Sequence, residues 1–340
     1  MKITYICETS YHVLISILKI LQTDNLKCEI ILIDNMKDID RIYDNLVSKR
    51  LFEKVYRVPK VEIPYFKRDI FKYRKMRKFL ESKYNDEILK GRNIYIYNDW
   101  SSIGYYLNLK GIRYYLLEDG LDCYKRGGMI EQYYKKLEKP VYKIRRFFKY
   151  GVFCMGDSPY MYSLEVNNKN GLCINNKKII EMSRKELYLS LNVNKQQMLL
   201  DIFLDKDHEI TGLNENQEAS ILLTQPLYFD HIVKSEEIQI ALYKKLIKEY
   251  GIGQIWIKPH PRDEIDYSKV FSECHAVLLP QGVPVELFEF LPDFRCKRLI
   301  TAYSTAANGI DFCEDKVIFT REEIDEMCKT IENEMESEIK

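Results

Sequence analysis

The sequence lacks the features that mark secreted, membrane-spanning or nucleic-acid-binding proteins. Its nine cysteines are odd in number and form no C-x-x-C pair, so the pattern predicts neither a zinc site nor a disulfide framework and favours a reducing compartment. No stretch of about 18 residues is uninterrupted by polar residues, which argues against a membrane span. A strand-like segment at residues 3–7 follows Met1 too closely to leave room for a signal peptide. We therefore expect a cytoplasmic protein.

Charge is also nearly balanced, with a net value of +1, so overall charge selects no partner and any electrostatic bias must be local. No nucleic-acid-binding motif, internal repeat or low-complexity tract is present. Hydrophobic residues make up 46% and charged residues 30% of 340 residues, which is typical of a folded protein with two domains.

Short apolar runs alternate with amphipathic stretches along the chain, a pattern typical of parallel sheets with crossover helices. The runs predict strands at residues 3–7, 29–34, 54–58, 93–97 and 113–118, and again at 220–224, 254–258, 276–279, 298–302 and 317–319. The intervening patterns predict helices at residues 11–21, 39–50, 67–82, 101–109, 177–191, 236–250 and 321–336.

Residues 151–217 lack the alternation of apolar runs and amphipathic stretches and contain clusters of turn-forming and polar residues. They are interpreted as a connecting region with some helix. Two similar α/β halves with a linker describe the GT-B architecture, in which two Rossmann-like domains face a central cleft. We place the first domain at residues 1–155 and the linker plus second domain at 156–340, with a core at about 217–320.

The most informative strand exit is Glu118-Asp119-Gly120, where a hydrophobic run meets two carboxylates and a glycine. Ligand-binding groups gather at such exits in α/β sheets, and the glycine permits a sharp turn. Neighbouring strand residues point to opposite faces, so at most one of the two acids is expected to act as a base. A solvated turn is an equally good reading of this spacing.

A second strand exit carries Lys258-Pro-His260-Pro261-Arg262. The prolines stiffen the loop, and the cations and imidazole suit a phosphate, with His260 donating a hydrogen bond or a proton. Four further exits are candidates of lower weight, since each also fits an ordinary helix cap or turn. They comprise Ser304-Thr305, Thr224-Gln225-Pro226, and the amino-terminal Thr9, Ser10 and His12, with Asn98 on a fourth.

Two D-x-D motifs, a pattern that can hold a divalent cation, occur at Asp38/Asp40 and Asp205/Asp207. Both lie in charged, helix-like stretches and are interpreted as solvated helix faces, so no metal site is predicted. Cations surround aromatic residues at 66–79 and again at 143–149. That pattern fits contact with an anionic membrane surface, capture of an anionic glycan, or a solvated helix face.

In this order, the motifs resemble those of bacterial sialyltransferases, and most of all glycosyltransferase family 52. The resemblance spans about residues 3–310 and depends on the opening Tyr5–His12 segment, the acid-acid-Gly motif, the Thr-Gln-Pro turn, the His-Pro motif and the late Ser304-Thr305 pair. One position departs from the family: Leu227 stands where some members carry a catalytic Asp just after the proline. We expect Asp119 to take that role, with Glu118 nearly as good and Asp230 behind them.

The resemblance implies metal-independent, inverting transfer of sialic acid from CMP-sialic acid to a hydroxyl of a surface oligosaccharide, of capsule or lipooligosaccharide type, on the cytoplasmic side of the bacterial membrane. Asp119 or Glu118 would take the acceptor proton and His260 would serve the departing CMP. Thr224, Gln225, Pro226, Lys258, Pro261, Ser304 and Thr305 would bind the donor, while Thr9, Ser10, His12, Asn98 and Gly120 would line the acceptor side. The alternatives are a UDP-sugar or CDP-glycerol transferase and a non-catalytic glycan-binding protein.

Overall fold

The computed structural model describes residues 2–23, 27–62, 72–84, 91–119, 156–172, 178–204, 218–291, 294–304 and 306–338, together with a few isolated positions between them. The chain divides into two compact units, Met1–Ile202 and Phe203–Lys340, each of which is described by itself.

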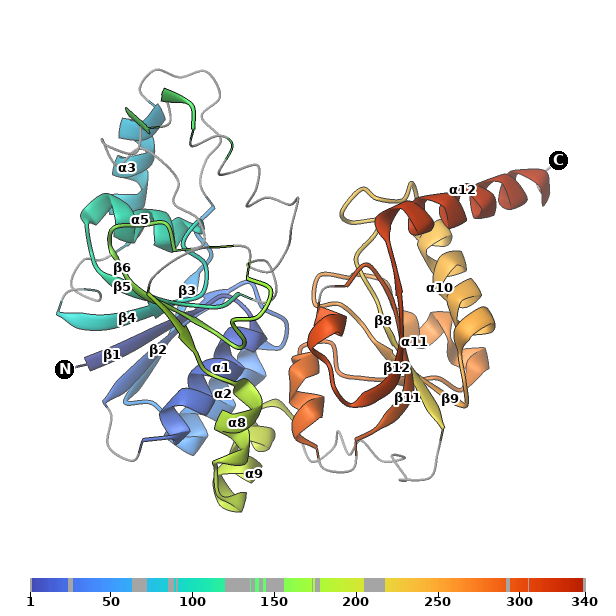
Figure 1. The fold of residues 1–340 in the computed structure, drawn as a ribbon, viewed down its shortest axis with the longest axis horizontal. Coiled ribbons are helices and arrows are strands. Elements are labelled where there is room, and N and C mark those ends of the chain that lie inside the picture. The colour runs from blue at the N-terminus through green and yellow to red at the C-terminus, as the bar shows by residue number, and fades with distance from the viewer. Residues whose placement is uncertain are drawn as a thin grey trace. The chain divides into compact units, whose positions relative to one another are not determined.

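The first unit is built on a parallel sheet of seven strands (Figure 1). The central strands β1 and β2 are hydrophobic runs, as expected for parallel strands covered on both faces. Four residues of β1 and six of β2 are buried. The spatial order of the seven strands is β3-β2-β1-β4-β5-β6-β7. The bounds are β1 (Lys2–Cys7), β2 (Cys28–Asp34), β3 (Lys54–Pro59), β4 (Arg92–Ile96), β5 (Tyr114–Leu117), β6 (Met161–Val166) and β7 (Ile179–Glu181).

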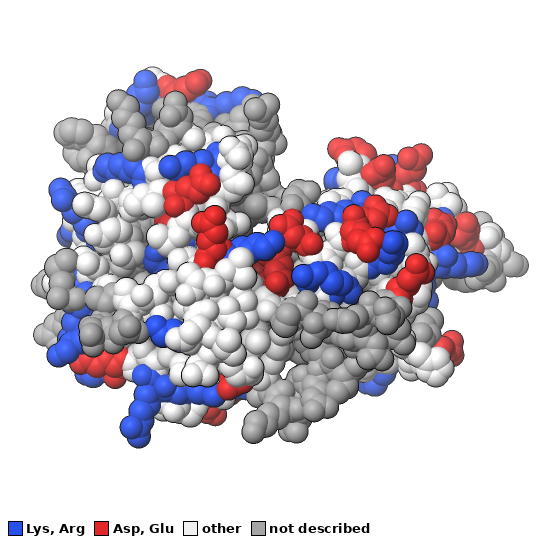
Figure 2. Space-filling model, turned by 60° about the horizontal axis from the view of Figure 1, so that its bottom comes forward, with Lys and Arg blue, Asp and Glu red and all other residues white. Residues whose placement is uncertain are grey.

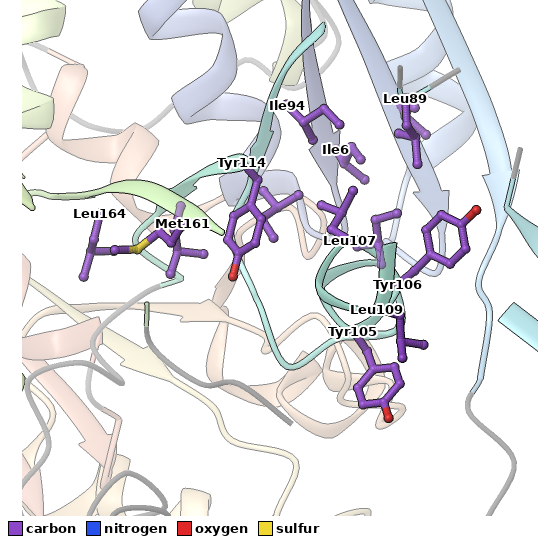
Figure 3. Close-up of a cluster of buried hydrophobic side chains, with 14 of the residues drawn as sticks. Ile6, Leu89, Ile94, Tyr105, Tyr106, Leu107, Leu109, Tyr114, Met161 and Leu164 are labelled. Carbon is purple, nitrogen blue, oxygen red and sulfur yellow. The ribbon is translucent and has the colours of Figure 1, made fainter. Parts of the chain in front are cut away.

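Helices cover both faces of this sheet (Figure 1). One face carries α1 (Ser10–Leu21), α2 (Ile39–Lys49), α8 (Arg184–Leu189) and α9 (Val193–Phe203), and the other carries α3 (Lys72–Lys83) and α5 (Ser102–Lys110). The core between the sheet and α5 is shown in Figure 3, where, in this view, Tyr114 of β5 lies between Met161 and Leu164 of β6 on one side and Leu107 of α5 on the other. Burial of this apolar surface is the main stabilising contribution.

The second unit has a parallel sheet of five strands in the order β10-β9-β8-β11-β12. Its strands are β8 (Ala219–Leu223), β9 (Gln254–Lys258), β10 (Val277–Leu278), β11 (Cys296–Ala302) and β12 (Cys313–Phe319). The helices are α10 (Glu236–Tyr250), α11 (Tyr267–Val270) and α12 (Arg321–Glu338), with 3₁₀ segments at Ser272–Cys274, Val285–Phe290 and Ala306–Gly309. Leu242 and Leu246 of α10 and Ile324 of α12 are fully buried in its core.

The two sheets share one topology, that of a doubly wound fold. In each, the strand order reverses beside the first strand, between β1 and β4 in one sheet and between β8 and β11 in the other. Ligands in such sheets bind outside the carboxyl ends of the strands at this reversal. The segments that follow β1, β4, β8 and β11 are therefore where binding residues are expected.

The prediction of two α/β domains with parallel sheets is confirmed. The structure places the division near residue 202, after β6 and β7 have joined the first sheet, whereas the sequence pattern put it at 155. The expectation of no disulfide is wrong, since Cys296 and Cys313, paired in register at the start of β11 and β12, are joined by one. Within the described residues, no helix is long and apolar enough to cross a membrane.

Candidate functional site

A hydrogen-bonded group of three side chains lies at the carboxyl edge of the first sheet. His12 is in the first turn of α1 after β1, Asn98 follows β4, and Asp119 follows β5. The His12 Nε2 atom is 2.9 Å from Asp119 Oδ1, and Asn98 Nδ2 donates to Asp119 Oδ2 at 3.2 Å. Residues 107 positions apart in the chain thus meet where the doubly wound fold predicts a binding site.

The hydrogen bonds of His12 fix its tautomer. The backbone N–H of Glu8 donates to Nδ1 at 3.1 Å, so Nδ1 is unprotonated and the ring proton is on Nε2, from which it is donated to Asp119. The ring is stacked on Tyr97 at 4.1 Å between centroids, and the Tyr97 hydroxyl donates to the His12 carbonyl at 2.7 Å. His12 is therefore a buried, pre-oriented donor whose partner is the Asp119 carboxylate.

The two acids of the Glu118-Asp119 motif have different surroundings. Glu118 is 4% exposed and accepts a hydrogen bond from the backbone N–H of Asn167 at 2.6 Å, which ties the exit of β5 to the segment after β6. The Asp119 side chain is 27% exposed and therefore open to a substrate. Burial raises the pKa of Asp119, but its interaction with the Nε2–H group of His12 and the hydrogen bond from Asn98 outweigh that effect and leave the pKa lowered. Asp119 is accordingly ionised at neutral pH and able to accept a proton.

The other acceptor-side candidates have structural roles or fall outside the description. Thr9 is the N-cap of α1 and accepts from the His12 backbone N–H at 3.3 Å, which holds His12 at the start of the helix. Ser10 is buried in the first turn of α1. Gly120 lies outside the described residues.

The second unit presents its own loop at the carboxyl edge of its sheet, directly after β9. The backbone N–H of Arg262 donates to His260 Nδ1 at 3.1 Å, so the ring proton is again on Nε2, which is left to donate. Burial, together with the charges of Arg262 and Lys258, lowers the pKa of His260 to about 4. His260 is therefore neutral at pH 7, and folding stability falls as the pH drops from about 6.5 toward 4, because the unfolded chain binds the proton more readily.

A buried polar network holds this loop against the exit of β8. Thr224 accepts from the His260 backbone N–H at 2.9 Å and donates to Asp263 at 3.0 Å. Asp263 also accepts from the Tyr267 hydroxyl at 2.7 Å and from Gln239 at 3.1 Å. Thr224 is thus a bridge that orients His260. Asp263 was not predicted from the sequence, because an acid three positions after His260 carries no signal of its own.

Lys258 also supports the loop. Its side chain is buried, and Nζ donates to the carbonyls of Pro259 at 3.1 Å and Gln281 at 3.0 Å. The Gln281 amide in turn donates to the carbonyls of His260 and Asp263 at 2.7 and 2.6 Å. The ammonium group therefore holds the backbone of Pro261 and His260 in place and, in addition to burial, its positive charge lowers the pKa of the His260 imidazole.

The segment after β8 gives its four singled-out residues different surroundings. Both backbone polar groups of Gln225 bond to the Tyr243 hydroxyl, and Pro226 is buried beside it. Leu227 is fully buried in the core of the unit, so the position that departs from the family has a packing role in this chain. Asp230 forms a bidentate pair with Arg262 at 2.7 and 3.0 Å, and that cation occupies both of its oxygens.

The exit of β11 completes the second site. Ser304 is 7% exposed and directly follows the left-handed residue Tyr303, whose φ is 35°. It lies across the topological reversal from Thr224, as a phosphate-binding residue of a doubly wound sheet is expected to. Thr305 lies outside the described residues.

The charged motifs singled out in the sequence have ordinary partners where they are described. Asp38 pairs with Arg41 and Asp40 with Arg57, which fits solvated faces, whereas Asp205 and Asp207 lie outside the description. Among the described residues no cluster of three metal-ligating side chains occurs. The described cations of α3 are exposed, and the face in Figure 2 shows acids and bases interspersed. Membrane contact through the stretch at 66–79 stays a prediction.

The fold is similar to those of solved bacterial sialyltransferases and of a UDP-GlcNAc 2-epimerase. The structure is similar to that of the α/β-galactoside α-2,3-sialyltransferase of the marine bacterium Photobacterium phosphoreum, with a TM-score of 0.57 and 13% sequence identity. The match covers 94% of this chain and 90% of the sialyltransferase. A Photobacterium 2,6-sialyltransferase solved with CMP and lactose matches over 93% and 71%, with a TM-score of 0.58 and 12% identity. The UDP-GlcNAc 2-epimerase of Methanocaldococcus jannaschii also matches, over 97% and 92%, with a TM-score of 0.52 and 13% identity. These likenesses define a GT-B-like fold.

The family follows from the sequence match. The chain belongs to glycosyltransferase family 52, whose model matches residues 27–321. An uncharacterized protein of Haemophilus influenzae is 31% identical over 218 residues, a match that spans 63% of this chain and 63% of that relative. The family predicted from the ordered motifs is therefore confirmed.

Proposed function

We propose that the protein is a sialyltransferase that transfers sialic acid from CMP-sialic acid to a hydroxyl of an oligosaccharide. Family membership supports glycosyl transfer, and likeness to sialyltransferase folds supports the donor. The observation that carries the proposal is the ionised, partly exposed Asp119 carboxylate held by His12 and Asn98. A carboxylate in this state is what a transferase needs to remove the proton of a sugar hydroxyl.

The reaction is a single displacement. As the acceptor oxygen bonds to the anomeric carbon, its proton moves to Asp119, and the bond from that carbon to the phosphate oxygen of CMP breaks with inversion. The Nε2–H of His260 donates to the phosphate as negative charge develops on the departing oxygen, and Ser304 supplies a hydroxyl. Since the pKa of His260 is lowered to about 4, it acts first as a hydrogen-bond donor, and the bound phosphate is what raises its basicity.

Nucleotide selectivity is the direct test of the donor. CMP is expected to raise the melting temperature of the purified protein more than UMP, UDP or GDP at equal concentration, because a ligand bound only to the native state stabilises it. Differential scanning fluorimetry measures this shift. Stabilisation by UDP equal to or above that by CMP would favour a UDP-sugar donor, an alternative suggested by the likeness to an epimerase that binds UDP-GlcNAc.

Metal independence is a separate expectation. CMP carries one phosphate, and its charge is handled in this proposal by an imidazole and a hydroxyl, so transfer should keep its rate after dialysis against EDTA. The rate is measured with CMP-sialic acid as the donor and a panel of oligosaccharides, including lactose, as acceptors. A rate that is lost in EDTA and returns with Mg²⁺ or Mn²⁺ would show that a cation takes part.

A further inference from the structure

A cavity of about 640 Å³ lies in the first unit, on the face of the sheet covered by α3 and α5. The strands contribute Ile6, Ile33 and Val58, and the helices contribute Phe79 and Ile103. Ile6 and Leu89, which also lines the cavity, are labelled in Figure 3. Its volume is within the ~300–1,000 Å³ of small-molecule pockets. None of the residues assigned above to the donor or the proton transfer lines it.

The cavity opens toward solvent at charged residues. Lys60, Glu62 and Lys83 line it and are exposed, whereas Ile6, Ile33 and Ile103 are at most 5% exposed. An apolar interior of this kind offers water few hydrogen-bond partners, so hydrocarbon binds there more favourably than water does. The arrangement suits a hydrocarbon chain that enters past a polar mouth.

A second hollow of about 350 Å³ adjoins this cavity. It shares six lining residues with the cavity, among them Val61 and Tyr84, and adds Glu8, Ser101 and Ser102. The backbone N–H of Glu8 donates to His12 Nδ1 at 3.1 Å, and Ser101 Oγ donates to the Asn98 carbonyl at 2.9 Å. Two of the three polar residues are thus bonded directly to residues that hold Asp119.

We propose that the acceptor is a glycan attached to an apolar aglycone, with its sugar in the second hollow beside Glu8, Ser101 and Ser102 and its hydrocarbon chain in the cavity. This inference rests on the proposed function for the identity of the sugar end, but the hydrocarbon end rests on the cavity alone. The Glu8 carboxylate and the hydroxyl oxygens of Ser101 and Ser102 can accept hydrogen bonds from a sugar, although the two serines also bond to the Asn98 carbonyl and the Tyr84 hydroxyl. The aliphatic and aromatic lining of the cavity matches methylene groups.

The test compares binding of octyl β-lactoside and methyl β-lactoside, below the micelle concentration, to the full chain by titration calorimetry. The two ligands share one sugar, so their difference reports the chain alone. Each buried methylene tightens binding by up to about fourfold, and we expect the octyl ligand to bind at least on the order of tenfold more tightly. Val61→Trp and Phe79→Trp each place an indole in the cavity from a different wall, and should abolish that difference.

Val193→Trp, at an exposed position on α9, is the matched control and should keep it. Melting curves identify a variant that fails to fold, and the second wall variant then decides. Equal binding of the two lactosides to the unmodified protein overturns the inference even if sialyl transfer is observed. Equal discrimination by both folded wall variants overturns it as well. If transfer from CMP-sialic acid is absent while the octyl preference depends on the cavity, the proposed function fails and the hydrocarbon site stands.

Discussion

Asp119→Asn is expected to lower kcat by about 10²–10⁴, the usual effect of removing a general base, while leaving CMP affinity unchanged. The asparagine keeps the size of the side chain and its contact with Asn98 but cannot take a proton. The KM for the acceptor should change little, so the loss appears in both kcat and kcat/KM. Steady-state kinetics with CMP-sialic acid, together with calorimetric titration of CMP, measures both quantities.

Glu118→Gln is the matched control because it makes the same chemical change one residue away. Glu118 is buried and accepts a hydrogen bond from the Asn167 backbone N–H, so loss of its charge should lower the melting temperature while kcat changes little. If Asp119→Asn retains full activity, the base lies elsewhere, and Asp230→Asn is the next variant to measure. A collapse of CMP affinity in Asp119→Asn would place this carboxylate on the nucleotide instead of the acceptor.

His260→Ala is expected to reduce both turnover and CMP affinity, because its proposed partner is the phosphate. A lost hydrogen bond to a charged group weakens binding by roughly 10–100-fold, and loss of a donor to developing charge costs on the order of 10²–10³ in kcat. His260→Gln is the informative companion, since the amide N–H of glutamine can stand near the Nε2 position and restore part of the CMP affinity.

A second histidine of the same unit provides the control for these variants. His275 is exposed and adopts the left-handed conformation with φ 49°, which asparagine tolerates, so His275→Asn should leave kcat and CMP affinity as they are. Equal losses in His260→Ala and His260→Gln would point to a requirement for the ring itself. Unchanged CMP affinity in His260→Ala would contradict the assignment of this loop to the phosphate.

Local sequence patterns predicted the strands and their exits well, because an apolar run followed by a turn is visible without any partner. Strand β9 was placed at its observed bounds, and β1 and β8 within one residue. Strand β7 was missed because the sequence analysis extended one helix over residues 177–191. The strand has only three residues, two of them exposed, which is too short to show an alternating pattern. The neighbouring strand β6 was also missed, because residues 151–217 were interpreted as a connecting region. The first domain was therefore expected to end at residue 155.

The partners of the site residues could not be predicted, because they are set by which strands become neighbours. The contact of His12 with Asp119 requires β1, β4 and β5 to be adjacent, an order that no local pattern specifies. The same holds for the pairing of Cys296 with Cys313 on neighbouring strands. The burial of Glu118, Lys258 and Leu227 could not be predicted either, because burial depends on the whole packed unit.

His12 and His260 have the same hydrogen-bond arrangement at their Nδ1 atoms. In both, a backbone N–H of the histidine's own loop, from Glu8 or from Arg262, occupies Nδ1 and leaves the proton on Nε2. Each unit thus contains one imidazole of known tautomer at the place where it is proposed to meet a substrate. In a chain with only five histidines, nitrogen NMR of these two rings offers a separate reporter for each unit, with His12 sensing the acceptor end and His260 sensing the nucleotide.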